Sequence, residues 1–181
     1  MADGIYYRDT RQPFRIADEA SITLATTAKA LWAPALTILP ANYWTLGKLV
    51  KLTAYLKWTT GTAGDVVWSM AYGAGDNPAP IVSSVARAKI ASVGPFGAFI
   101  QGYARCRSIG TAGTLSMFGM VFPDLSVMLS TVQPIVFPSG GVTVVSTIDT
   151  TVGTNALTFQ ASMSAGTDTI VTTELVMEAL N

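Results

Sequence analysis

The chain has 181 residues, of which 50% are hydrophobic and only 12% charged, with equal numbers of basic and acidic side chains and no histidine. Histidine is the commonest general base, proton shuttle and metal ligand, so its absence argues against most hydrolytic and metal-dependent enzymes. A single cysteine, Cys106, excludes an intrachain disulfide and a cysteine–histidine zinc site, and we expect it to be a buried apolar thiol. High apolarity then suggests that other protein subunits cover much of the surface.

Charge is sorted along the chain although its total is zero. Residues 1–28 carry a net charge of −1, residues 29–107 a net +6, and the residues beyond Arg107 a net −5. In one interpretation all segments fold into one body and their fields largely cancel. In the other, the surface has complementary faces that pack against copies of the chain or a lattice. The sequence leaves both interpretations open.

Residues 1–19 are predicted to form an extended N-terminal arm, and residues 20–181 a single β domain. The arm is dense in charge, contains Pro13 and lacks the apolar segment of a secretory signal. Such arms either stay loose or become ordered by wrapping over a partner. Aromatic side chains favour docking, and the expected contacts with partner subunits come from Tyr6, Tyr7, Arg8, Arg11, Phe14 and Arg15.

Beyond the arm, apolar residues alternate with polar ones in short segments separated by Gly, Pro, Asn and Thr, which is typical of half-buried strands. The first segment places on one face Val50, Leu52, Ala54, Leu56 and Trp58. The second places there Ala98, Ile100, Gly102, Ala104 and Cys106, with Phe99 and Tyr103 opposite. The third segment places on one face Leu157, Phe159, Ala161 and Met163. The fourth segment places on one face Val171, Leu175 and Met177. Further strands are expected at about 21–28, 31–39, 65–72, 83–91, 115–122 and 142–149.

Roughly ten short strands without a helical pattern predict an all-β fold: an antiparallel β-sandwich or jelly roll of about 8–10 strands. The tetrapeptide GTAG occurs at 61–64 and 110–113, and two glycine turns explain this more simply than a duplicated hairpin. The longest uncharged stretch, 125–148, could span a bilayer by length. Pro134 and Pro138 within it break a membrane helix, so no membrane partner is expected.

No group of residues forms a catalytic motif. Ser83 and Ser84 near Lys89 lack the pattern of an activated nucleophile. Glu174 and Glu178 would lie about 13 Å apart on one strand face, too far for a retaining glycosidase pair. Asp76 and Asn77 fit a turn better than a calcium loop, and no glycine-rich phosphate loop occurs. We therefore predict no catalytic residue, no cofactor and no metal.

Nucleic-acid binding has one weak indication. Arg87, Lys89, Arg105 and Arg107 are placed by the alternation on one exposed sheet face with Tyr103, as in some single-strand binders. On a neutral protein, a rim of interface charges explains these cations better. No nucleic-acid partner is expected.

The run LWAPALTILPANYWTLGKLVKLTAYLKWTTGTAGDVVWSMAYG resembles the jelly-roll virion proteins of tailed bacteriophages. It contains an apolar strand, a Pro-Ala-Asn-Tyr turn, Gly-Lys, an alternating basic strand and a threonine–glycine turn. The resemblance covers residues 21–72 and 156–181, and Leu39 stands where the family more often joins Ile directly to Pro. Pro40 withholds an N–H and so ends a strand. The resemblance implies homotrimers that decorate the capsid shell, or components of tails and fibres.

The sequence therefore predicts a non-enzymatic virion structural protein, assembled in the host cytoplasm. Its partners would be copies of itself, as a homotrimer, and the major capsid protein on the outside of the phage head. The alternative is a tail-fibre, collar or receptor-binding component with exposed loop aromatics. Trp44, Phe96 and Phe137 are the candidates, although core packing explains them more simply. A third possibility, an enzyme that degrades cell-wall polymer, is not favoured because the sequence shows no recognisable acid–base pair.

Overall fold

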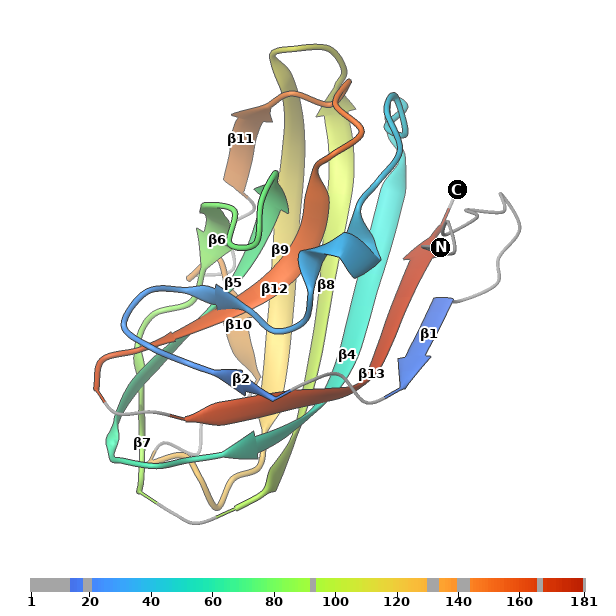
Figure 1. Ribbon diagram of the computed structural model, residues 1–181. Helices are drawn as coiled ribbons and strands as arrows, with labels where there is room; N and C mark the ends of the chain where they lie inside the picture. The colour runs from blue at the N-terminus through green and yellow to red at the C-terminus, as the bar shows by residue number, and fades with distance from the viewer. Residues whose placement is uncertain are drawn as a thin grey trace.

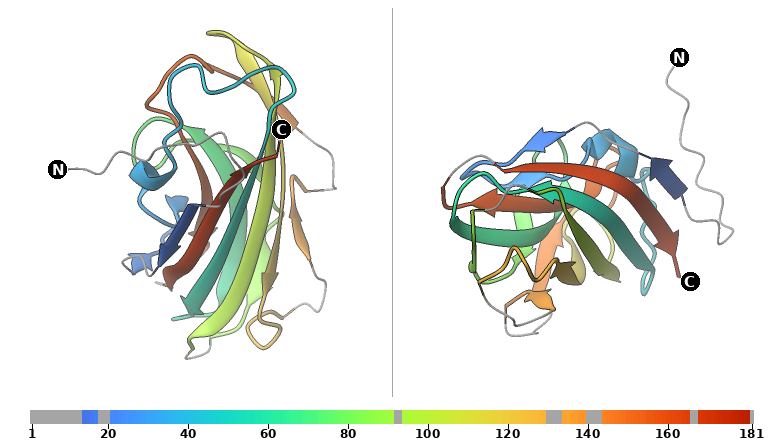
Figure 2. Two further views of the ribbon diagram at one scale, coloured as in Figure 1. Left: turned by 90° about the vertical axis from the view of Figure 1, so that its right-hand side faces the viewer. Right: turned by 90° about the horizontal axis from the view of Figure 1, so that it is seen from below.

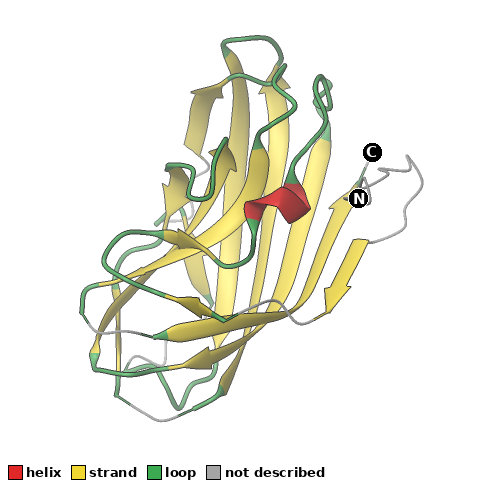
Figure 3. Cartoon of the chain, in the orientation of Figure 1, coloured by secondary structure: helices red, strands yellow, loops and turns green. Residues whose placement is uncertain are grey.

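The computed structural model describes residues 14–17, 21–91, 94–129, 134–139, 144–165 and 168–180, with the side chains of 14–17 and 144–146 not described. These residues are almost all strand and turn (Figure 3). Their one helix is the short 3-10 helix η1, Pro34–Thr37. No helix in these ranges has the length and apolarity to cross a bilayer.

Two antiparallel sheets face each other across the core (Figure 1). The larger sheet has eight strands: β1 (Phe14–Ala17), β2 (Ile22–Thr23), β4 (Leu49–Thr59), β8 (Phe96–Ser108), β9 (Gly113–Pro123), β10 (Ile135–Phe137), β11 (Val144–Ile148) and β13 (Thr169–Ala179). The smaller has five: β3 (Lys29–Ala30), β5 (Gly64–Gly73), β6 (Pro80–Ser83), β7 (Arg87–Lys89) and β12 (Ala156–Met163). The larger sheet curls, as the views in Figure 2 show. The predicted all-β sandwich is confirmed.

Two long-range connections between the sheets lie together at one corner. The chain passes from β4 to β5 and, much later, from β12 to β13. The crossings lie together because β4 pairs with β13 in the larger sheet and β5 pairs with β12 in the smaller one. The strands β8 and β9 instead form an ordinary hairpin within the larger sheet.

The two GTAG segments serve these different connections. Residues 61–64 lie in the corner between β4 and β5, whereas residues 110–113 turn the hairpin between β8 and β9. In the hairpin, Gly113 N donates to Gly110 O at 3.1 Å. The segments are therefore two glycine-containing turns in unlike settings, as the simpler interpretation expects.

Alternation correctly predicts the inner face of the larger sheet. All of the apolar positions predicted for β4 are buried, and so are those of β8, including Cys106. Aromatic side chains fill the space between the sheets, and Trp58 meets Trp68 edge to face with ring centroids 5.5 Å apart. Burial also raises the pKa of the Cys106 thiol, which favours its neutral form.

Three strand predictions are wrong in detail. Residues 31–39 contain η1, because Pro34 suits the first turn of a helix. Residues 83–91 are divided between β6 and β7, which pair with different parts of β5. Residues 21–28 contain only the two-residue β2. Such division, together with very short edge strands, explains why thirteen strands are described where about 8–10 were expected.

The predicted faces of the last two long strands also need correction. In β12 both faces are buried, because η1 packs over it and Gln160 Nε2 donates to Pro78 O at 2.7 Å. In β13 a bulge between Thr172 and Glu174 shifts the register. Thr172 is consequently buried, and Val171 does not share the inner face with Leu175.

Candidate interaction surface

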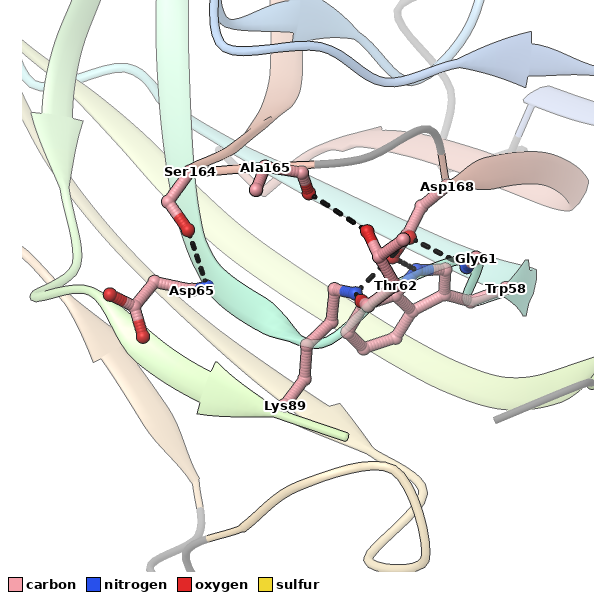
Figure 4. A network of polar contacts seen from close by, with 8 residues as sticks. All are labelled: Trp58, Gly61, Thr62, Asp65, Lys89, Ser164, Ala165 and Asp168. Atoms are coloured by element: carbon pink, nitrogen blue, oxygen red, sulfur yellow. Dashed lines mark hydrogen bonds and ion pairs between the residues drawn. The ribbon is translucent and has the colours of Figure 1, made fainter. Parts of the chain in front are cut away.

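A buried ion pair lies at the corner where the chain crosses between the sheets (Figure 4). Lys89 Nζ, from β7, lies 3.1 Å from Asp168 Oδ1, and both side chains are fully buried. The same oxygen accepts Gly61 N at 2.9 Å, while Oδ2 accepts Trp58 Nε1 at 2.7 Å. Lys89 Nζ also donates to the carbonyl of Thr62. Each charged group thus has hydrogen-bonding partners from its own chain. We call these contacts the corner network. Both charged side chains are fully buried, so the network has no opening to a substrate.

The corner network overturns the predicted basic face. Lys89 is inside the molecule rather than on its surface. Arg87 belongs to β7 in the smaller sheet, whereas Arg105 and Arg107 belong to β8 in the larger one. The four cations therefore do not line one sheet face with Tyr103, and that prediction is wrong.

The ion pairs also bear on the sorted charge. Lys51 lies 3.2 Å from Glu178, and Lys89 pairs with Asp168. Each pair joins the basic middle of the chain to its acidic C-terminal part. Within the described residues the two segments form one body, which favours the interpretation that their fields largely cancel.

Three aromatic side chains form a row on the outward face of the larger sheet. Tyr55 in β4 is the register partner of Phe99 in β8, which is in turn the partner of Phe122 in β9. The ring centroids are 5.0 Å apart for the first pair and 5.9 Å for the second. Tyr55 is 47% exposed and Phe122 37%. Two exposed rings with a half-buried ring between them form one apolar patch, so this aromatic row is the strongest candidate interaction surface of the described residues.

A shallow hollow lies beside the aromatic row. Its lining includes the three rings, Gly97 and Asp124. Gly97 leaves it open, because a Cβ added there would meet no atom within 4 Å. The hollow can therefore accept an apolar side chain against the rings.

Opposite charges flank the hollow. Lys57 is the register partner of Gly97 on one side, and Asp124 N donates to Gly97 O at 3.0 Å on the other. Both Lys57 and Asp124 are exposed. Ser126 holds Asp124 as a carboxylate: its hydroxyl and its N–H both donate to Oδ1 and lower the pKa of Asp124. The face thus has a cation, a hollow and an anion in one line beside the rings.

The other end of this face is basic. Arg105 and Arg107 are exposed near the end of β8, and half-buried side chains of Tyr103, Phe118 and Met120 lie between them and the aromatic row. The outward face of the larger sheet is therefore graded from aromatic to basic along its strands.

The predicted contact residues of the arm fall into two groups. Phe14 and Arg15 lie in β1, where their backbones pair with Met177 and Val176 at the edge of the larger sheet. Tyr6, Tyr7, Arg8 and Arg11 lie outside the described residues. The arm contacts remain a prediction.

The aromatics named for a receptor-binding loop cluster are not exposed together. Trp44 and Phe137 are buried in the core, and Phe96 packs against that core at the start of β8. Core packing is the correct explanation for them. The aromatic row was missed as a unit because alternation gives a residue's face and leaves open which residues align across strands.

Two findings concern the residues that the sequence analysis considered for chemistry. The described residues contain no group of three or more side chains suited to holding a metal ion. Ser84 Oγ accepts from Trp68 N and donates to Val85 O, so it serves the backbone rather than Lys89. Comparison with family models, curated proteins and solved structures finds no match for this chain.

Proposed function

We propose that the chain is a non-enzymatic virion structural protein of a tailed bacteriophage that acts by adhesion. As a homotrimer it would decorate the outside of the head and stabilise the shell of the major capsid protein. The observation that carries this proposal is the aromatic row of Tyr55, Phe99 and Phe122 on the larger sheet, in which Tyr55 and Phe122 are exposed. The resemblance of residues 21–72 and 156–181 to phage virion proteins supports the same function.

Adhesion fits the distribution of polar groups in the described residues. The one fully buried ion pair among them is used inside the fold, at the corner network. The outward face supplies rings, a hollow and flanking charges, which bind surfaces and perform no bond chemistry. Burying such a face contributes about 25 cal/mol per Å² of apolar area, before the cost of association.

The arm would provide the second contact, with neighbouring capsid subunits. Its proposed contact residues are Tyr6, Tyr7, Arg8, Arg11, Phe14 and Arg15. Because β1 is an edge strand, the chain enters the sandwich at the border of the larger sheet. An arm that starts at a border can reach a surface beside the domain without disturbing its core.

Binding to heads tests this function. Purified protein is mixed with phage heads that lack decoration, and the bound fraction is measured by co-sedimentation. We expect saturable binding by the full chain and weaker binding by a chain lacking residues 1–13. Equal binding by the shortened chain would disprove the role of the arm. Failure of the full chain to bind heads would disprove decoration.

The exposed rings also support one other function. Aromatic faces bind sugars and protein side chains, so a tail-fibre, collar or receptor-binding component remains the second candidate. In that case the protein would bind host cells or a glycan array and ignore heads. Tyr55→Thr would then reduce binding to the host ligand.

A further inference from the structure

The aromatic row exposes apolar surface that a partner protein can cover. Tyr55 is 47% exposed and Phe122 37%, and Leu125, which follows the hollow-lining Asp124 in the chain, is 56% exposed. With about 200 Å² for each fully exposed side chain, these three present roughly 300 Å² of apolar surface. A standard interface buries about 800 Å² on each partner, so the patch forms a substantial part of one.

The flanking charges identify that partner. Lys57 and Asp124 lie on either side of Gly97, two strand spacings or about 10 Å apart. Among the described residues no ion pair joins them or occupies Lys57. A surface that carries a cation on one flank and an anion on the other is complementary to a copy of itself placed beside it.

We propose that the aromatic row and its hollow are the contact between copies of this chain, with Lys57 of each copy facing Asp124 of the next. This inference rests on the proposed homotrimer. Around a threefold axis, each basic flank meets the neighbour's acidic flank, and the three aromatic rows meet near the axis. Head-to-tail contacts close into a ring of three when each copy is rotated by one third of a turn from the one before, whereas like flanks facing each other would repel.

Cysteine cross-linking tests the proposed contact in the full chain. In the variant carrying Lys57→Cys and Asp124→Cys, a disulfide within one chain is excluded, because Cα atoms about 10 Å apart cannot be bridged. Disulfides between neighbours should therefore produce covalent dimers and trimers on non-reducing gels, with trimers as the largest species. Each single variant should remain uncross-linked. The native Cys106 is buried and does not compete.

A second pair of exposed positions controls for disulfides that form by random collision. Leu46 and Val85 are 74% and 45% exposed and lie away from the hollow. The variant with Leu46→Cys and Val85→Cys should give no trimer at the same concentration. Monomers only from Lys57→Cys with Asp124→Cys, or a ladder extending beyond three chains, would overturn the proposed contact.

Removing the rings gives a second, independent measurement. Tyr55→Thr with Phe122→Thr should weaken trimer formation by about 100-fold or more in sedimentation equilibrium. The control Ile109→Thr removes another exposed apolar side chain and should leave it unchanged. Wild-type association in the folded double variant would overturn the proposal. If that variant does not fold, the cysteine result decides. Trimers that fail to bind heads would disprove decoration while leaving this contact intact.

Discussion

The corner network and the aromatic row are the two unusual regions of the described residues, and they are unusual in opposite ways. At the corner, Lys89 and Asp168 are charged and fully buried. On the outward face of the larger sheet, Tyr55 and Phe122 are aromatic and exposed. The buried charges are matched by donors and acceptors of their own chain, including Trp58 Nε1 at 2.7 Å. Among the described residues Tyr55 and Phe122 each make a ring contact with Phe99, and we propose that a neighbouring copy covers the surface left exposed.

The largest effect should come from breaking the corner network. Asp168→Ala leaves the Lys89 ammonium buried without its carboxylate and frees the donors of Trp58 and Gly61. We expect a loss of about 3–5 kcal/mol in the free energy of unfolding, measured by urea denaturation.

The half-exposed pair of Lys51 and Glu178 is the control for that variant. Lys51→Met should cost less than about 1 kcal/mol, because water screens an exposed ion pair. Equal losses for Asp168→Ala and Lys51→Met would mean that burial does not distinguish the two pairs.

Alanine substitutions at two glycines of the larger sheet should have different effects on its inner and outer faces. A Cβ at Gly119 would lie 2.0 Å from the Phe137 ring, whereas one at Gly97 meets no atom within 4 Å. Gly119→Ala should therefore destabilise the fold by about 1–3 kcal/mol, and Gly97→Ala should be close to neutral. Thermal unfolding of both variants measures this. A neutral Gly119→Ala would show that Phe137 does not pack against β9 as described.

Neighbouring threonines of β13 provide a smaller contrast. Thr172 Oγ1 donates to Leu31 O at 2.6 Å inside the protein, and Thr173 Oγ1 donates to Tyr55 O at 3.1 Å at the surface. Thr172→Val should cost about 1 kcal/mol in urea denaturation, since it deprives a buried carbonyl of a donor. Thr173→Val should cost less, because water can replace the lost bond. The reverse order would contradict the bulge that turns Thr172 inward.

The smallest expected effect is on the stability of the protein at acid pH. Hydrogen bonds from Ser126 lower the pKa of Asp124, and those from Thr151 lower the pKa of Asp149, below the ordinary value of 3.8. A carboxyl with a lowered folded-state pKa stabilises the protein above its unfolded-state pKa, and the contribution disappears as pH falls through the folded-state value. Stability should therefore be insensitive to these groups near neutrality and decline below about pH 4. Asp149→Asn should make that decline shallower in acid titrations followed by circular dichroism. An unchanged decline would contradict the assignment.

Local alternation was sufficient to predict the sandwich and its inner face. The buried side of β4 follows directly from the spacing of Val50, Leu52 and Ala54. It was insufficient where one extra residue shifts a strand, as at the bulge before Glu174. It was also insufficient for the 3-10 helix at Pro34, since a four-residue element has too few positions to show a period.

The two unusual regions depend on contacts between distant residues. Lys89 and Asp168 are 79 positions apart, Lys89 in β7 and Asp168 in the connection just before β13, so no local pattern pairs them. Alternation placed Phe99 outward, and Tyr55 lies outward by the same spacing in β4. Their alignment with Phe122 depends on register, which includes a shift between Cys106 and Ser108. The sequence therefore indicated aromatic positions on that face and could not show that they form one row.

The most direct test of the central claim is the mass of the intact chain in solution. If the aromatic row is covered by copies of the chain, light scattering at micromolar concentration should report three chains of 19.0 kDa, or about 57 kDa. The same measurement on the chain with Tyr55→Thr and Phe122→Thr should report mostly 19.0 kDa. A stable 19.0 kDa monomer of the unaltered chain would contradict the account.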